Sequence, residues 1–475
     1  MIFRATALSW VVAALCFTPT AFSVTNYADD FVDPAYILDF QYQTVTAKAQ
    51  QIIVQWANAL NLASPWSVTS KKYLAPSGDK HDYMSWRPYY WPNCTNAGNT
   101  TVLTVDEMFK TCDYYNVDGA LNPDARLINN VGDFDDLANA VLYNALAWGI
   151  TRSGIYSKRV VSYLNTWFLD ADTYMNPNLN YAQMAGGPTG QNGTHTGVLD
   201  LKCMAKICAG VELLRQGNAE GWNSTFDASL QGWVTQYISW ITTDSIAVEE
   251  KKSTNNHGTF YFAQLASLYI LANDTSNAAS TAQEYFTTTF MAQINADGDQ
   301  PLESARTRPY HYLAYNLAAM ITVGRLGQYA GYDGWNSTST LGGTIPAAAD
   351  FAMAYPPGAD TASELYPFIG AVGAIYGDSD STLASWLNTQ TNGSYISDAS
   401  YLWNQPLSDS GVSANMSYIT FAANPKGTGT LSVGTQPTGG TSSSGGSSSS
   451  ATPRSSAVSW STIGAMVVLA VLCHL

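Results

Sequence analysis

The chain has 475 residues, only 12% of which are charged, and a formal net charge of −15 at pH 7. This composition argues against nucleic-acid binding, whose electrostatic footprint is a basic surface. An acidic chain can still bind an acidic polymer through a locally cationic groove, because distant charges are screened beyond ~8–10 Å at physiological ionic strength.

The N-terminal residues 1–23 combine an early positive charge, an apolar run and small residues at the end, which predicts a cleaved secretory signal peptide. Helical spacing of apolar residues then recurs along the chain, and Gly-, Asn- or Asp-rich turns separate many of the segments. The expected helices are 37–62, 133–149, 156–169, 199–217, 229–241, 258–272, 279–294, 308–326 and 361–376. A loop region at 63–130 is rich in Pro, Gly, Asn and aromatic residues. Because β-strand alternation is scarce, we predict an all-α fold, an (α/α) toroid or incomplete barrel of helical hairpins with long loops at one end.

The C-terminal part predicts attachment to a cell surface. Residues 425–456 are Ser- and Gly-rich and are expected to form a disordered stalk. Residues 457–475 contain a terminal apolar run typical of a GPI-attachment signal. A single-span tail anchor is the alternative, but the run is well short of the ~20 residues of a spanning helix. We therefore expect one domain, residues 24–424, that is secreted and GPI-anchored to the plasma membrane or cell wall of a fungal-type cell.

Cysteines and glycosylation sequons fit an exported chain. Four cysteines remain once both terminal signals are removed, and we predict the disulfides Cys94–Cys112 and Cys203–Cys208 among three possible connectivities. A zinc site is the alternative, but the CxxC spacing is absent. Eight Asn-x-Ser/Thr sequons predict a glycoprotein; they lie at Asn93, Asn99, Asn192, Asn223, Asn273, Asn336, Asn392 and Asn415.

Two short segments concentrate polar groups that are scarce elsewhere. The first, residues 255–258, places Asn256 and His257 at the start of a strongly apolar helix. Asn is a preferred helix cap, so a purely structural role is one interpretation. The pair gains interest because Lys251 and Lys252 precede it and a second polar, cationic segment follows about fifty residues later.

The second segment, residues 303–312, contains two arginines and a tyrosine. If a helix begins near Arg308, then Arg308 and Tyr312 share one face, and Arg306 can turn toward the same cavity. Alternatively, Glu303 pairs with an arginine and Tyr312 packs in the core. Together the two segments offer a clamp for a sugar carboxylate, a base for its α proton and an acid for the leaving oxygen.

These motifs resemble the alginate lyase superfamily, which folds as an (α/α) toroid. The resemblance rests on Asn-Asn-His-Gly-Thr at 255–259, on Gln-Pro-Leu-Glu-Ser-Ala-Arg-Thr-Arg at 300–308 and on His-Tyr at 311–312. Segments 81–92, 118–123 and 175–183 match in the expected order, so the resemblance spans roughly residues 80–325.

The resemblance implies a role for each polar group. Tyr312 would be the catalytic tyrosine and His257 its neighbouring histidine, while Asn256 and Arg306 would neutralise the uronate carboxylate and so acidify the C5 proton. In D-mannuronate and D-glucuronate the C5 proton and the C4 oxygen lie on the same face, so Tyr312 could serve both. In L-guluronate or L-iduronate they lie on opposite faces, and His257 becomes the expected base. No cofactor and no metal is required.

Further residues are candidates for substrate binding. Aromatic residues on the loop at 86–91 suit sugar stacking, with loop packing as the alternative. His195 lies in a Gly-rich loop and is expected to be a surface or lid residue rather than a ligand. The candidate substrate-binding residues are Arg308, Gln183, Trp86, Arg87, Tyr89 and His311.

The sequence therefore predicts a monomeric polysaccharide lyase that cleaves a 1,4-linked uronic-acid polymer, either alginate or polymannuronate or glucuronan, by β-elimination. One alternative is a glycoside hydrolase that uses two carboxylates such as Glu303 and one of Asp133 to Asp136. The other is a non-catalytic protein that binds cell-wall carbohydrate.

Overall fold

The computed structural model describes residues 30–42, 46–98 and 102–405, and the backbone of two short strands at 417–421 and 431–435. The predicted signal peptide and attachment signal lie outside these residues, as do Asn99 and Asn415. Of the predicted stalk only residues 431–435 are described, and they form a strand, β6, that pairs antiparallel with β5 at 417–421. The other six sequon asparagines are all exposed, so each is accessible to glycosylation. Within the described ranges, no helix is both long enough and apolar enough to cross a membrane.

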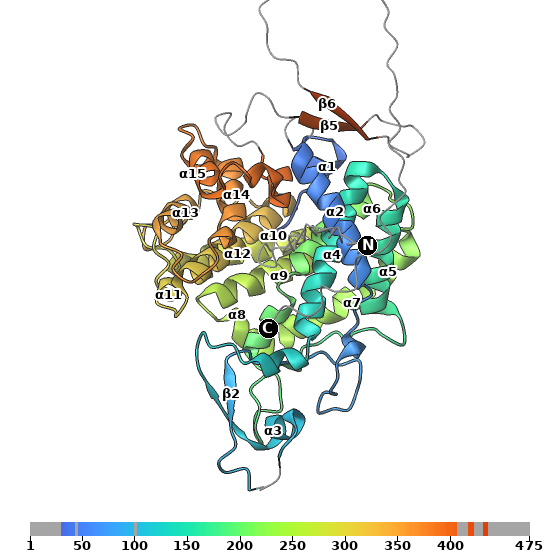
Figure 1. Ribbon diagram of the computed structural model, residues 1–475, viewed down its shortest axis with the longest axis vertical. Coiled ribbons are helices and arrows are strands. Elements are labelled where there is room, and N and C mark those ends of the chain that lie inside the picture. The colour runs from blue at the N-terminus through green and yellow to red at the C-terminus, as the bar shows by residue number, and fades with distance from the viewer. Residues whose placement is uncertain (1–29, 43–45, 99–101, 406–416, 422–430, 436–475) are drawn as a thin grey trace, which may run out of the picture. The chain divides into compact units, whose positions relative to one another are not determined.

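Helices form most of the described chain, as predicted (Figure 1). Their bounds are α1 Pro34–Leu38, α2 Ala47–Ala63, α3 Val105–Thr111, α4 Asn130–Thr151, α5 Gly154–Leu164, α6 Met204–Gln216, α7 Ser224–Thr243, α8 Ser245–Lys251, α9 Asn256–Leu271, α10 Thr275–Thr287, α11 Pro301–Ser304, α12 Pro309–Ala330, α13 Ile345–Ala354, α14 Tyr366–Tyr376 and α15 Thr382–Thr391. Short 3-10 helices include His195–Leu201, which matters for the site.

The core runs along helices that are buried on nearly all sides. Helix α4 packs against α2 and α6, and α9 packs against α6, α10 and α12. Most residues of α9 and α12 are buried, and a helix that is apolar all round belongs in the interior of a protein. The first turns of α9 and α12, which carry the two polar segments, are thereby fixed by a packed core.

Several element boundaries differ from the sequence prediction. The expected helix at 37–62 is divided into α1 and α2, and Phe40, just after α1, has a left-handed φ of 56° that no helix continues through. The expected helix at 156–169 leaves α-helical geometry after Leu164 and ends in a π-helical turn, Asn165–Leu169. The expected helix at 199–217 is interrupted where the 3-10 helix gives way to α6.

The loop region at 63–130 is a folded element with its own small core. Strand β1 (Met84–Trp86) pairs in parallel with β4 (Tyr181–Met184), and β2 (Tyr90–Asn93) pairs antiparallel with β3 (Asp113–Asn116). The rings of Trp86 and Phe109 stack with centroids 4.0 Å apart. In Figure 1 this region, with β2 and α3, lies at the lower end of the helical array.

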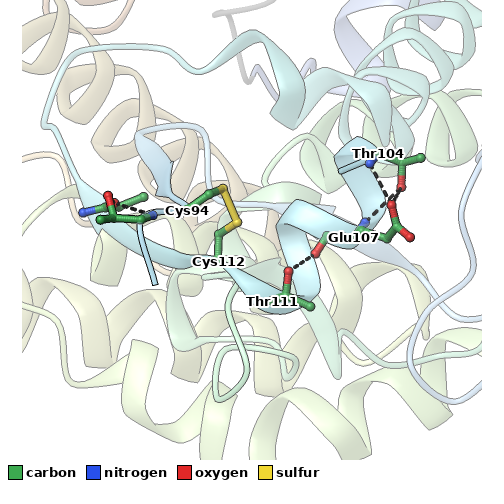
Figure 2. Close-up of a disulfide and its surroundings, with 7 residues drawn as sticks. Cys94, Thr104, Glu107, Thr111 and Cys112 are labelled. Carbon is green, nitrogen blue, oxygen red and sulfur yellow. Dashed lines mark hydrogen bonds between the residues drawn. A yellow bond between two sulfur atoms is a disulfide. The ribbon is translucent and has the colours of Figure 1, made fainter. Parts of the chain in front are cut away.

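The predicted disulfide Cys94–Cys112 is confirmed, and it joins the end of β2 to the end of α3. Figure 2 shows this bond next to Thr111 at the C-terminal end of α3; at the opposite end of the helix, Thr104 and Glu107 form reciprocal hydrogen bonds that cap it. The loop that carries β2 is therefore tied covalently to the small core.

The predicted disulfide Cys203–Cys208 is wrong, because both residues are buried thiols. Cys203 caps α6 and Cys208 lies within it. Five residues of helix separate their Cα atoms by about 7.5 Å along the axis alone, at ~1.5 Å per residue. A disulfide spans at most about 7 Å between Cα atoms, so the helix keeps the two thiols apart.

Candidate active site

A cleft of about 570 Å³ lies between the loop region and the N-terminal ends of α9 and α12. This volume is typical of ligand sites. Its lining includes all four predicted catalytic residues and five of the predicted substrate-binding residues; these are Asn256, His257, Arg306, Tyr312, Trp86, Arg87, Tyr89, Gln183 and His311. The two polar segments, separated in sequence, thus meet in one cavity.

Asn256 is the first residue of α9 and is held by a buried carboxylate. Its backbone N–H donates to Glu303 Oε1 at 2.7 Å, and its Nδ2 donates to Glu303 Oε2 at 2.6 Å. Its Oδ1 is buried and has no hydrogen-bond partner among the described residues. Burial raises the pKa of Glu303, although the hydrogen bonds from Asn256 act in the opposite direction. The alternative in which Glu303 pairs with an arginine is therefore wrong, since its hydrogen bonds go to Asn256.

His257 follows on the same turn and contacts a second buried carboxylate. Its Nδ1 lies 2.7 Å from Glu250 Oε1, and Glu250 is the penultimate residue of α8. The other carboxylate oxygen of Glu250 lies 2.6 Å from Nδ1 of His195, at the start of the 3-10 helix. His195, expected on the surface or a lid, is two-thirds buried and lines the cleft.

Arg306 and Tyr312 lie in direct contact. The guanidinium sits over the tyrosine ring, 3.9 Å from its centroid, and Arg306 Nη2 donates to the Tyr312 hydroxyl at 2.9 Å. The same Nη2 donates to Asp118 Oδ1 at 2.9 Å, and Thr307 Oγ1 donates to Asp118 Oδ2 at 3.1 Å. Asp118 follows β3, so this pair fastens the loop region to the start of α12.

The environment of Tyr312 favours its protonated form. Burial raises its pKa, and a hydrogen bond with Tyr89 raises it further, whereas Arg306 lowers it. A neutral phenol with a cation at its oxygen is a poised proton donor. To act as a base it must first lose its proton, which for an ordinary tyrosine costs about 4 kcal/mol at pH 7.

His311 and Arg308 are anchored by two acidic residues from the segment before α14. Arg308 Nε donates to Asp360 Oδ1 at 2.7 Å, and its Nη2 lies 3.7 Å from Glu364. His311 Nδ1 lies 2.7 Å from Glu364 Oε2. Arg308 is not among the described residues that line the cleft. The segment before α14 thus helps to hold the first turn of α12 in place.

The remaining candidates form the wall contributed by the loop region and by β4, which pairs with its strand β1. Arg87 donates to the hydroxyl of Tyr90 at 2.5 Å and to Thr194 Oγ1 at 3.2 Å. Gln183 lines the cleft with its side chain bonded to buried Asp200 at 2.8 Å. Trp86 is buried and packs on Phe109, which fits the loop-packing alternative better than sugar stacking.

Sequence reasoning missed the acidic residues that hold this site. Glu250, Asp118, Asp360 and Glu364 received no role, and each contacts a predicted site residue from another element. The one sequence feature that could have indicated Glu250 is the pair of glutamates, Glu249 and Glu250, directly before Lys251. That lysine instead pairs with Glu284 at 2.7 Å and does not line the cleft.

Comparison with known proteins identifies the class to which this fold and site belong. The family model for alginate lyase matches residues 67–362, more than half of the chain. A crystal structure of an alginate lyase from Bacteroides ovatus is 27% identical, covers 78% of this chain and 97% of its own, and has a TM-score of 0.68. Alginate lyase A1-III from a Sphingomonas species is 14% identical over 65% of this chain and 78% of its own, with a TM-score of 0.39. Comparison with curated proteins finds no match.

The chain is a polysaccharide lyase with the all-α toroid fold that was predicted. It belongs to the alginate lyase family. This membership favours the predicted lyase over the hydrolase and over a non-catalytic carbohydrate-binding protein.

Proposed function

We propose that this enzyme cleaves a 1,4-linked polyuronate by β-elimination in the cleft between α9 and α12. The observation that carries the proposal is the contact of Arg306 with Tyr312, 2.9 Å between Nη2 and the hydroxyl, in a cavity that also contains Asn256 and His257. This set provides donors for a carboxylate, a proton donor and an imidazole.

The reaction needs three events that these residues can serve. Asn256 and Arg306 bind the C6 carboxylate and stabilise the negative charge that develops when the C5 proton leaves; preorganised donors in a water-poor cleft do this well. The C5–H electron pair then forms the C4=C5 double bond, and the C4–O bond breaks. Tyr312 donates its proton to the departing oxygen, so no water is consumed.

The identity of the base follows the stereochemistry of the sugar. Where the C5 proton and C4 oxygen lie on opposite faces, His257 takes the proton through Nε2, since its Nδ1 contacts Glu250. Where they lie on the same face, Tyr312 serves both steps, and Arg306 over its ring supports the tyrosinate. The raised pKa of Tyr312 makes the second route the more demanding one.

We propose alginate, polymannuronate or glucuronan as the substrate class. Cations line the cleft at Arg87, Arg126 and Lys202 as well as Arg306, which suits a chain with a carboxylate on every sugar. The alginate lyase from Bacteroides ovatus supports alginate as the first polymer to test.

The deciding experiment incubates the purified enzyme with alginate, polymannuronate, polyguluronate, glucuronan and pectate. A lyase produces the ultraviolet absorbance of the conjugated C4=C5 product together with new reducing ends. Reducing ends without that absorbance would establish hydrolysis, and neither signal on any polymer would reject the proposal.

We also propose that the protein is a monomer displayed outside the cell on a GPI anchor. The disulfide Cys94–Cys112 and the exposure of the six described sequons support export. Release from intact cells by a phosphatidylinositol-specific phospholipase, with a mass shift on deglycosylation, is the expected result. Retention on the cells would favour the tail-anchor alternative.

A further inference from the structure

Glu250 is a buried carboxylate that lies between two imidazoles of the cleft. Its side chain is 0% exposed, and its two oxygens approach Nδ1 of His257 at 2.7 Å and Nδ1 of His195 at 2.6 Å. The three residues come from α8, α9 and the 3-10 helix before α6. Each carboxylate oxygen thus serves a different histidine on a different element.

By residue type these three groups could also hold a metal ion. The distances between the imidazole nitrogens and the carboxylate oxygens indicate direct hydrogen bonds instead. Ligand atoms about 2.0–2.2 Å from a tetrahedral zinc ion lie roughly 3.3 Å or more apart. The measured separations of 2.6 and 2.7 Å are those of charge-assisted hydrogen bonds. Nδ1 of each ring therefore carries the proton given to Glu250.

This arrangement fixes the tautomer of both histidines. With Nδ1–H donated to Glu250, Nε2 is the remaining ring nitrogen of His257 and of His195, and both residues line the cleft. A carboxylate behind an imidazole is the usual way in which proteins orient it and raise its basicity. Here a single carboxylate orients two rings whose centroids are 6.4 Å apart.

The charges around His195 favour its cationic form. The hydrogen bond to Glu250 raises the pKa of His195, and Glu249, whose carboxylate lies 3.9 Å from Nε2, raises it as well, whereas burial and Arg87 lower it. Burial would raise the pKa of Glu250, but its bonds to His195 and His257 hold it below the ordinary value. An ionised carboxylate thus faces two imidazoles, and the charges around His195 favour its imidazolium form.

We propose that Glu250 is a positioning residue shared by two histidines, and that His195 is a second substrate-binding imidazole that binds a carboxylate of the polyuronate beside the one held by Asn256 and Arg306. The second part rests on the proposed function. The first part does not, because it concerns the tautomers of the enzyme without substrate.

The first test measures the tautomers directly by ¹⁵N NMR of the histidine-labelled enzyme, which contains five histidines. At a pH where the rings are neutral, we expect protonated Nδ1 and unprotonated Nε2 for His257 and His195. In Glu250→Gln the amide has one acceptor and one donor group, so one ring must switch to the Nε2–H tautomer. Unchanged tautomers in this variant, or Nε2–H in the parent, would overturn the positioning role whether or not a substrate has been found.

The second test compares kinetics on the most active polymer. Glu250→Gln is expected to lower kcat about 10²-fold, and Glu284→Gln, which alters an exposed carboxylate that pairs with Lys251 and does not line the cleft, serves as the matched control. If the two variants have equal kcat, the positioning role is rejected. Because the parent is assayed alongside, a parent without lyase activity would reject the proposed function and leave the tautomer result standing.

The role of His195 is tested with His195→Gln. The parent should show a KM that rises with pH as the imidazolium of His195 is lost, and the variant should show a higher KM without that rise and with kcat changed less than threefold. Thermal unfolding monitors folding of the variant. A KM equal to that of the parent across pH 6–9 would show that His195 is only structural.

Discussion

Replacing Tyr312 by phenylalanine removes one oxygen from the cleft and keeps the ring. The variant therefore distinguishes the role of the hydroxyl in catalysis from the role of the ring in packing. The hydroxyl accepts from Arg306 at 2.9 Å, and Arg306 keeps its bond to Asp118 in the variant. Proton transfer by a positioned side chain contributes typically 10²–10⁴-fold to a rate. At 1.36 kcal/mol per factor of ten, this is about 3–5 kcal/mol of transition-state stabilisation.

The same substitution changes stability little. Loss of the hydrogen bonds with Arg306 and Tyr89 costs about 1 kcal/mol each, and the ring of Tyr312 remains under the guanidinium. Tyr310→Phe is a matched control on the same helix, because the buried Tyr310 hydroxyl donates to the backbone oxygen of Ala362 at 2.7 Å and does not line the cleft. We therefore expect both variants to unfold at similar temperatures.

The assay follows the absorbance of the unsaturated product at saturating polymer for the parent and both variants. Tyr310→Phe should retain parental kcat, and Tyr312→Phe should lose at least 10²-fold. A Tyr312→Phe enzyme within threefold of the Tyr310→Phe enzyme would refute the assignment of Tyr312 as the proton donor. Polymannuronate and polyguluronate are assayed separately, since the base is expected to differ between them.

Three further changes have defined outcomes. Arg306→Ala should lower kcat about 10²–10³-fold, as removal of one oxyanion-type donor does, measured with the same absorbance assay. Replacing Cys94 and Cys112 by serine opens a loop with a sequence separation of 18; a loss of about 3 kcal/mol in unfolding free energy is expected, together with a higher KM because the bond holds the end of β2, whose first residue Tyr90 lines the cleft. The hydrogen bond of His195 raises its pKa, so its contribution to stability is complete below the unfolded pKa of about 6.5 and is lost as the pH rises through the folded pKa. The difference in melting temperature between the parent and His195→Gln should shrink as pH increases; a constant difference would contradict this.

The long apolar helices could be predicted from sequence because burial on all sides leaves a continuous signal. The bounds of helices α4, α9 and α12 differ from the expected segments by only a few residues. The short helices α3 and α8 carry too few apolar residues for any periodicity to emerge. The expected helix at 37–62 is interrupted at Phe40, whose left-handed backbone could not be predicted from the pattern of apolar residues.

The site was predictable where chemistry is concentrated in one stretch of chain, and not where it depends on tertiary contact. Arg306 and Tyr312 lie six residues apart and meet as expected. Glu250 and Asp118 act on residues of other elements, and only the fold brings them together. The prediction of a Cys203–Cys208 disulfide was wrong for a related reason. It relied on close spacing in sequence and did not take account of the rise of a helix, which separates the two residues.

Two buried carboxylates behind the cleft, Glu250 and Glu303, have opposite environments, and this difference bears on how an acidic chain is proposed to bind an anionic sugar. The imidazoles of His195 and His257 lower the pKa of Glu250 and favour its charge. Burial raises the pKa of Glu303, next to the amide of Asn256, although the hydrogen bonds from Asn256 lower it. An ionised carboxylate beside Asn256 would repel the uronate that this amide is proposed to bind. Negative charge is thus favoured at Glu250, where it orients the histidines, and less favoured at Glu303, beside the amide that is proposed to bind the substrate carboxylate.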